Sequence, residues 1–246
     1  MAILGAVMGS FIGVVALRTG RDDGIVRARS RCDNCRRQLD IWELVPVVSF
    51  AVLRGRCRTC KARIAVLLPL LEIAGAAIGM ASAWIADDFA DLMLAGMGWT
   101  LLCLAILDMR HFWLPDRVTL PLAVAGIMFA ALQGDLISSL AGGAIGWAAL
   151  VLVAGIYERI TRRQGLGGGD PKLLAAIGTW VGAGALPFIV TAAALAGLAA
   201  AFIMAIRGQD IGRTTRLPFG TLLAIGTYIY VPMASFSLSL PYAVGW

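Results

Sequence analysis

Long apolar stretches separated by short polar segments dominate the chain. Several of these stretches are shorter than the roughly 20 residues of a full membrane span, and the boundary between the sixth and seventh is the hardest to place. The eight stretches are Ala2–Leu17, Ile64–Ala86, Leu92–Leu107, Val118–Leu132, Leu136–Tyr157, Leu173–Leu186, Pro187–Ile206 and Thr221–Leu240. Because they lack amphipathic periodicity, they favour helices surrounded by lipid. The pattern predicts an all-α polytopic membrane protein with about eight transmembrane helices.

The composition agrees with this fold class. The 246 residues are 59% hydrophobic and 15% charged, and the mean hydropathy is +0.83, which a soluble domain of this size does not reach. Small residues cluster within the stretches, as at Gly75-Ala76-Ala77 and Gly142-Gly143-Ala144. Such clusters let helices approach closely where lipid supplies no hydrophobic drive to association.

The basic residues define a topology. All 21 Lys and Arg lie in residues 18–63, 108–117, 158–172 and 207–216, whereas the alternate loops carry only acidic charges, namely Asp87, Asp88, Asp91 and Asp135. By the positive-inside rule the basic loops are cytoplasmic and both termini are periplasmic. The net charge of +6 therefore reflects orientation in a lipid bilayer, and no nucleic-acid partner is expected.

The expected domains are transmembrane helix 1 (1–17), a cytoplasmic zinc-binding domain (18–63) and a seven-helix transmembrane domain (64–246). The middle segment contains two CxxC pairs, Cys32/Cys35 and Cys57/Cys60. This spacing is zinc-ribbon-like and predicts a small domain around a closed, structural zinc site with four thiolate ligands. Disulfides are disfavoured in the reducing cytoplasm, and a redox-active or unliganded set of thiols is the alternative.

Two aspartates are the candidate catalytic residues. Asp108 ends the third stretch, and Asp170 follows a glycine-rich run before the sixth, so the topology brings both to the cytoplasmic face. Two carboxylates in a partly dehydrated site share one proton, and such a pair activates water and protonates a leaving amine. Asp116 is expected to be a helix cap. Glu72, inside the second stretch, is either functional or an interhelical hydrogen-bond partner.

Several motifs, taken in order, resemble those of the type IV prepilin peptidases. The matching segments are Gly9–Val15, Ser30–Cys35, Val45–Phe50, Leu53–Lys61, Pro69–Glu72, Asp108 with Leu114–Asp116, Gly167–Leu173 and Pro218–Gly220. The chain departs from the family pattern in a few places. Gly13 replaces an asparagine, Thr19 follows Arg18 where leucine-proline is usual, Gln164 replaces a glutamate, and Thr221 replaces the proline that commonly follows the late PFG motif.

The resemblance implies a membrane aspartic endopeptidase of the bacterial inner membrane. Such enzymes remove the basic leader of prepilins and type II secretion pseudopilins at the cytoplasmic face. Many also methylate the new N-terminus with S-adenosylmethionine. Carried onto this chain, Asp108 and Asp170 would be catalytic, and the residues expected to support them are Gly167, Gly169, Lys172 and Glu72.

Two other functions fit part of the sequence. A proton- or ion-coupled transporter would use intramembrane acids, but only Glu72 approaches the midplane depth at which transporter sites lie. A non-enzymatic scaffold would use the zinc module to bind a partner, but it gives no reason for the glycine-flanked Asp170. Cleavage of a prepilin by wild-type protein, and its loss in Asp→Asn variants, separates the peptidase from both.

Overall fold

The computed structural model describes residues 1–19, 30–85, 89–162, 165–208 and 217–238, without the side chains of 235–238. Over these residues the secondary structure is helical apart from two isolated β-bridges, and there is no named strand. The chain divides into two compact units, Met1–Cys103 and Leu104–Trp246. The acidic pair at 87–88, the basic loop at 209–216 and the expected end of the last span at 239–240 lie outside the described residues.

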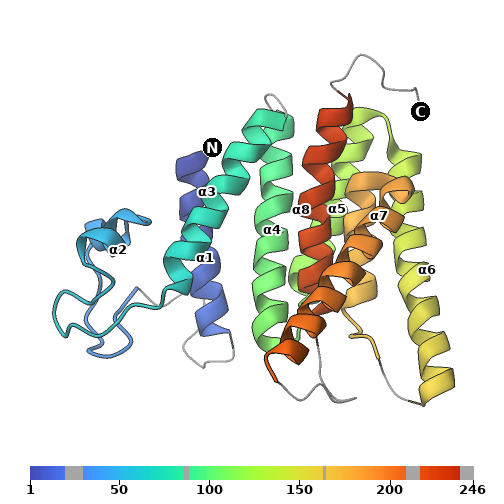
Figure 1. Cartoon of the computed structure of the whole chain (residues 1–246). Coiled ribbons are helices and arrows are strands. Elements are labelled where there is room, and N and C mark those ends of the chain that lie inside the picture. Colours follow the sequence, from blue (N-terminus) through green and yellow to red (C-terminus); the bar gives the residue numbers. More distant parts are fainter. Residues whose placement is uncertain (20–29, 86–88, 163–164, 209–216, 239–246) are drawn as a thin grey trace. The chain divides into compact units, whose positions relative to one another are not determined.

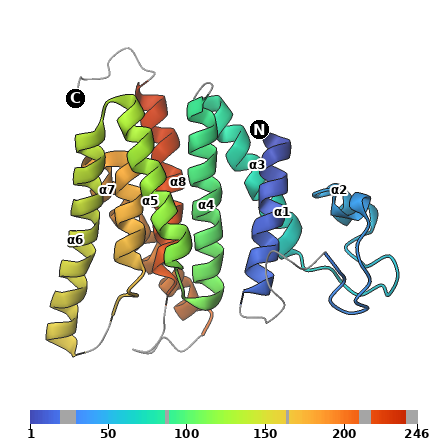
Figure 2. The same ribbon diagram turned by 180° about the vertical axis from the view of Figure 1, so that it is seen from behind.

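In the first unit, helices α1 (Ala2–Arg18) and α3 (Leu67–Ile85) pack against each other, side by side in Figures 1 and 2. Glycines make this contact close. A methyl group on Gly5 would overlap the carbonyl oxygen of Gly75, and one on Gly9 would overlap that of Leu71. The predicted role of the small-residue clusters is confirmed here, because only glycine lets the two backbones meet.

The same unit contains the cysteine-rich segment and the start of α4 (Phe89–His111). The segment forms a short 3-10 helix, η1 (Ile41–Leu44), and a five-residue helix, α2 (Val48–Val52), which contact each other. Its other regular features are the β-bridges Arg31–Gln38 and Arg56–Arg63, each of which closes a loop around one CxxC pair.

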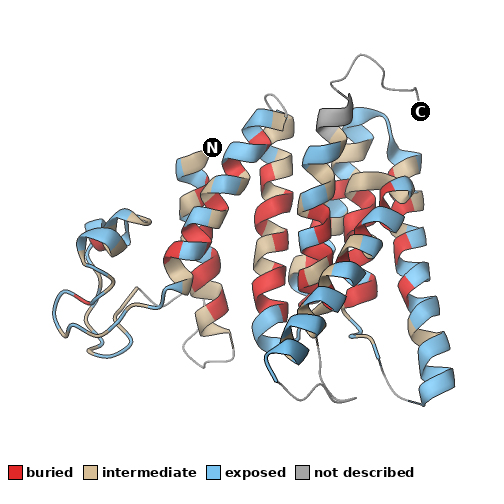
Figure 3. Ribbon diagram, in the orientation of Figure 1, coloured by how far each residue is buried: buried red, intermediate tan, exposed pale blue. Residues whose placement is uncertain are grey.

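In the second unit, α7 (Asp170–Ile206) is the central helix and packs against α5 (Asp116–Gln133), α6 (Leu136–Thr161) and α8 (Phe219–Leu238). The buried residues of α6 form a single stripe at Ser139, Gly142, Gly146 and Leu150, and the rest of that helix is largely exposed (Figure 3). This one-sided burial is typical of a helix that faces lipid on its other sides.

Helix α7 is broken at Gly182, where φ is 73° and ψ is 173°. The chain reverses there (Figure 1), so that Ile189 and Leu222 can contact Gly226 and Gly197, respectively, across α7 and α8. The expected boundary at Pro187 was wrong. Pro187 lies inside the helix that follows the break, whereas the backbone conformation of Gly182 is accessible essentially only to glycine.

Five helices, α3 to α7, are long and apolar enough to cross a membrane, so the chain is a polytopic membrane protein as predicted. Two further apolar helices are shorter. Helix α1 has 17 residues, and α8 is apolar over Phe219–Ala234. The half of α7 before Gly182 is about 18 Å long, less than the roughly 30 Å of a hydrocarbon core. The second half of α7 brings the chain back to the side from which the first half started. A re-entrant helix pair and two full spans therefore predict the same order of cytoplasmic and periplasmic loops.

Candidate active site and metal centre

Asp108 lies in the last turn of α4, and only 5% of its surface is exposed. Its Oδ2 accepts a hydrogen bond from the backbone N–H of Thr221 at 2.8 Å and lies 3.3 Å from the Thr221 hydroxyl. The same hydroxyl donates to the carbonyl oxygen of Ala105 at 2.8 Å. The first turn of α8 therefore binds both the carboxylate and the backbone of α4.

Asp170 is the first residue of α7 and is likewise 5% exposed. Its Oδ2 accepts a hydrogen bond from the backbone N–H of Gly167 at 3.0 Å, while its own N–H donates to the Gly167 carbonyl at 3.1 Å. The glycine run thus forms a tight turn that wraps back onto the carboxylate. A methyl group on Gly167 would lie 3.1 Å from that oxygen, so the turn leaves little space for a side chain.

The two aspartates, which the sequence placed only at the same membrane face, lie near each other in the second unit. Buried Leu114, between α4 and α5, is near the neighbours of both: a methyl group on Gly169 would lie 2.8 Å from its Cβ, and one on Gly220 would lie 2.9 Å from its Cδ1. The two carboxylates are also close enough to interact electrostatically. Residues from α4, α7 and α8 therefore converge on a buried carboxylate pair.

Lys172 lies beside this site, and in the part of the chain that the structure describes it pairs with Asp116 and not with either buried aspartate. Its Nζ donates to both carboxylate oxygens of Asp116 at 2.8 Å, and the two side chains are about half exposed. Asp116 is the first residue of α5, and Pro115 is the N-cap, so the expectation that Asp116 caps the helix was wrong. Its carboxylate instead pairs with the lysine of the second aspartate motif.

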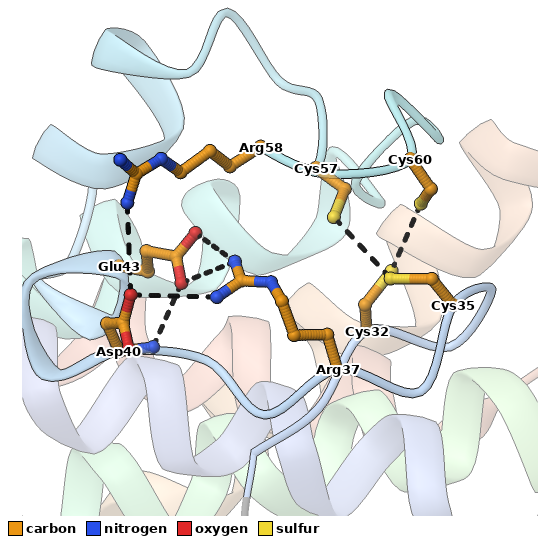
Figure 4. A network of polar contacts seen from close by, with 8 residues as sticks. All are labelled: Cys32, Cys35, Arg37, Asp40, Glu43, Cys57, Arg58 and Cys60. Carbon is orange, nitrogen blue, oxygen red and sulfur yellow. Dashed lines mark hydrogen bonds and ion pairs between the residues drawn. The ribbon is translucent and has the colours of Figure 1, made fainter.

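Cys32, Cys35, Cys57 and Cys60 form a cluster in the first unit (Figure 4). All four Sγ atoms lie within 4.8 Å of one another, with Cys32–Cys60 at 3.7 Å and Cys35–Cys57 at 4.0 Å. A tetrahedral zinc ion with 2.3 Å Zn–S bonds requires S–S separations of about 3.8 Å, whereas a disulfide requires about 2 Å. The cluster therefore has the dimensions of a zinc site with four thiolate ligands.

Backbone donors favour the thiolate at Cys57 and Cys60, whereas at Cys35 the backbone bond to Arg37 is outweighed by burial and the neighbouring thiols, which raise the pKa to about 11. The N–H of Ala62, followed by the side chain of Asn34, lowers the pKa of Cys60 to about 6. The N–H groups of Cys60 and Thr59 lower the pKa of Cys57. Metal ligation requires the deprotonated sulfur, so these donors prepare two of the four ligands.

The two CxxC loops have the same backbone geometry. The N–H of Cys32 donates to the carbonyl of Arg37, as that of Cys57 does to Ala62. In each loop the residue after the second cysteine has a positive φ, 60° at Arg36 and 58° at Lys61. The segment therefore consists of two matching knuckles, each of which places two sulfur atoms in the cluster.

An ion-pair network supports the first knuckle (Figure 4). Arg37 donates to both carboxylate oxygens of buried Glu43 at 2.6 and 2.7 Å, and the Asp40 N–H donates to Glu43 at 2.9 Å. Burial alone would raise the pKa of Glu43, but the hydrogen bonds from Asp40 and Arg37 outweigh it and lower the pKa. Arg58 comes from the second knuckle. Its Nη1 lies 3.9 Å from the Oδ2 of Asp40, and its guanidinium lies over the ring of Trp42, so the network links the two knuckles.

Glu72 lies in the first unit, in α3, and 8% of its surface is exposed. It accepts a hydrogen bond from the backbone N–H of Val47 at 2.6 Å. Val47 has a φ of 61°, and it immediately precedes α2. Glu72 thus ties the cysteine-rich segment to the start of α3, and together with Glu43 it lines a cavity of about 270 Å³. The sequence suggested a functional role or a hydrogen bond between helices for Glu72, and neither of these is the hydrogen bond to the loop residue Val47.

Comparisons with known proteins agree with this architecture. Residues 3–86 match the Bacterial Peptidase A24 N-terminal domain, and residues 95–202 match the Type IV leader peptidase family. A prepilin leader peptidase/N-methyltransferase of Burkholderia pseudomallei (strain K96243) is 38% identical, covering 91% of this chain and 81% of that protein. The chain belongs to the type IV leader peptidase family. The resemblance inferred from the motifs is confirmed.

Other members of the type IV leader peptidase family also align over most of the chain. The proteins of the same name from Neisseria gonorrhoeae and Dichelobacter nodosus are 30% and 38% identical, over 93% and 82% of this chain and 87% and 71% of their own lengths. No solved structure gives a significant match to the chain.

Sequence reasoning missed one residue of the site. Thr221 was noted only as a departure from the PFG-proline pattern, yet its N–H and hydroxyl both face Asp108. The signal available was the change from an imino acid to a residue with a backbone donor. This change could not be interpreted from the sequence, because the sequence does not show that the start of α8 packs against the end of α4.

Proposed function

We propose that this chain is an aspartic endopeptidase that cleaves the basic leader of prepilins or pseudopilins and methylates the new N-terminus. The observation that carries the peptidase proposal is the buried pair Asp108 and Asp170, held by backbone donors from two different elements. His111 is the chain's single histidine and is exposed, so a histidine-dependent triad is not available. Family membership gives no support to the transporter alternative.

The chemistry requires opposite protonation states in the pair. One aspartate is ionised and accepts a proton from water as the water oxygen bonds to the scissile carbonyl carbon. The other is protonated and donates its proton to the carbonyl oxygen, which gives a tetrahedral gem-diol. When the C–N bond breaks, the first aspartate passes the proton taken from water to the leaving amine nitrogen, and a hydroxyl proton of the gem-diol returns to the second aspartate as the new carboxyl group forms.

The glycine-rich motif supports substrate access. Gly168 has no other atom within 4 Å of the position that a Cβ would occupy, whereas Gly167 and Gly169 are held against Asp170 and Leu114. An extended substrate backbone approaching Asp170 would meet no side chain at this turn. We assign Gly167 and Gly169 to shaping the site, and Lys172 to joining the two aspartate motifs through Asp116.

The decisive experiment incubates purified protein with a prepilin in detergent and follows the size shift. D108N and D170N should each lower cleavage by at least about 10²-fold, the usual contribution of one general acid or base. D116N is the matched control, because it alters an exposed aspartate beside the same site that is paired only with Lys172. If D108N and D170N cleave like wild type, the peptidase proposal is wrong.

Methylation is proposed because the relatives named above carry N-methyltransferase in their names. S-adenosylmethionine would be the donor, and the acceptor would be the amine freed by cleavage. Methyl-labelled S-adenosylmethionine added to the same assay should label the cleaved product. Cleavage without label would refute the methyltransferase activity and leave the peptidase activity intact.

A structural zinc ion at the four cysteines is proposed from the fit of the sulfur cluster. Bound there, zinc would hold the two knuckles together, and its closed sulfur shell would leave no position for substrate. One zinc per chain is expected in protein purified without chelator. A metal content near zero would exclude the site.

We also propose eight membrane segments in the bacterial inner membrane, with the aspartates at the cytoplasmic face and both termini in the periplasm. The clustering of basic residues in alternate loops supports this orientation. Single cysteines introduced into a cysteine-free variant should react with an impermeant reagent from the periplasm at Gly134 but not at Arg110. The reverse labelling would overturn the orientation.

A further inference from the structure

Thr221 occupies an unusual place at the start of α8. In the first turn of any helix the N–H groups have no acceptor within that helix. In α8, the N–H of Leu222 donates back to the carbonyl oxygen of Pro218, and this bond is long at 3.3 Å. The Thr221 N–H instead donates to the Asp108 carboxylate at 2.8 Å, across 113 positions of sequence. A catalytic carboxylate thus satisfies a donor that the helix leaves free.

The hydroxyl of Thr221 binds the backbone of α4. It has one proton, and the two acceptors within reach are the Ala105 carbonyl at 2.8 Å and the Asp108 carboxylate at 3.3 Å. The shorter distance favours Ala105, one turn before Asp108 on α4. The hydroxyl therefore holds α8 against α4, while the N–H holds the carboxylate. Thr221 is 4% exposed, so water does not compete for either bond.

Gly220 makes this approach possible. A methyl group on Gly220 would lie 3.0 Å from the Oδ2 of Asp108 and 2.9 Å from the Cδ1 of Leu114. Because glycine has no such methyl group, the backbone of the first turn comes within hydrogen-bond distance of the Asp108 carboxylate. The helix N-terminus, with its partial positive charge, then faces the negatively charged form of Asp108.

We infer that Thr221 is a positioning residue for Asp108, which fixes the carboxylate through its backbone N–H and fixes α8 to α4 through its hydroxyl. This goes beyond the catalytic pair, since a proline at the same position has no N–H to donate. The inference rests on the proposed peptidase function.

Three variants at Thr221 separate the two bonds. T221S keeps both donors and should retain the wild-type kcat. T221V keeps the N–H and loses the hydroxyl, and we expect kcat to fall about three- to tenfold, the value of a neutral hydrogen bond. T221P loses both donors, and its ring would displace the carboxylate, so kcat should fall about 10- to 100-fold or more. Proline is tolerated in a first helical turn, so α8 itself should form.

Kinetics distinguish positioning from a merely structural role. Each loss should appear in kcat with little change in KM, because the bonds act on Asp108 and not on the bound prepilin. T227V is the matched control: Thr227 is a fully buried threonine of the same helix whose hydroxyl donates to the carbonyl oxygen of Leu223, within α8 itself. If T221V and T221P lose no more kcat than T227V, or if KM rises while kcat is unchanged, the inference is wrong.

A second measurement does not depend on activity. Amide hydrogen exchange of a peptide that begins at Phe219 should be faster in D108A than in wild type, because the Thr221 N–H loses its acceptor. Equal exchange in the two proteins would overturn the inference even if the enzyme is active. A wild-type protein that cleaves no prepilin, but shows this exchange difference, would refute the proposed function and leave the contact between Thr221 and Asp108 established.

Discussion

The contact between α6 and α7 makes a sharp prediction about stability. Gly142 and Gly178 meet backbone to backbone, and a methyl group on Gly142 would overlap the Gly178 carbonyl oxygen and lie 2.9 Å from the carbonyl carbons of Gly178 and Gly182. No side chain can rotate away to relieve this clash, because all three atoms belong to the main chain. G142A must therefore move one helix away from the other.

The expected cost follows from the structure. Overpacking a close contact costs about 1–3 kcal/mol, and the backbone location of this clash places G142A toward the upper part of that range. Separation of the helices would also lengthen the bond from the Ser139 hydroxyl to the Thr179 carbonyl, now 2.7 Å, which contributes about 1 kcal/mol more. Destabilisation of about 2–4 kcal/mol is expected.

Detergent-denaturation curves followed by circular dichroism measure this cost. G155A is the matched control, because Gly155 lies in the same helix and a methyl group there would meet no atom within 4 Å. G155A should change the free energy of unfolding by no more than about 0.5 kcal/mol. If G142A and G155A unfold alike, α6 and α7 do not meet at these glycines, and the reasoning from close backbone contact is refuted.

Two further predictions concern the charged groups. The pKa of Glu43 is lowered below its ordinary 4.5, so the ionised carboxylate stabilises the fold above that pH and this contribution is lost as the pH falls through the lower, folded-state value. The gap in melting temperature between wild type and E43Q should therefore be constant near neutral pH and shrink in acid; a gap independent of pH would contradict this. Since the ion pair between Lys172 and Asp116 is half exposed, K172M should cost at most about 1 kcal/mol of stability and, in the cleavage assay, less than tenfold in rate. A loss as large as that of D170N would show that Lys172 acts on the substrate.

Much of the architecture could be predicted because its causes are local. A stretch of apolar residues predicts a membrane helix wherever it packs, and a CxxC pair determines a knuckle within a few residues. The break in α7 shows the limit of this reasoning. Proline was expected to break the helix, but Pro187 lies within it, and the non-helical conformation belongs to Gly182.

The two aspartates differ in the same respect. The carboxylate of Asp170 is bound by Gly167, three residues away, so its surroundings are contained in one motif that can be recognised by inspection. The carboxylate of Asp108 is bound by Thr221, which depends on the packing of α4 against α8. Lys172 and Asp116, 56 positions apart, are joined in the same non-local way. The periodicity of the sequence does not predict contacts between residues so far apart in the chain.

This difference has a consequence for how the site tolerates change. Substitutions within the turn at Gly167 act on Asp170 directly and cannot be compensated from elsewhere, since donor and acceptor belong to one turn. The support of Asp108 comes from a separate helix, so it can be lost by a change at Thr221 or by any change that moves the start of α8. It can also be replaced, because another first-turn donor or a bound water could face the same oxygen. Variation after the PFG motif is therefore expected to change the rate of cleavage, while variation in the glycine-rich turn is expected to abolish it.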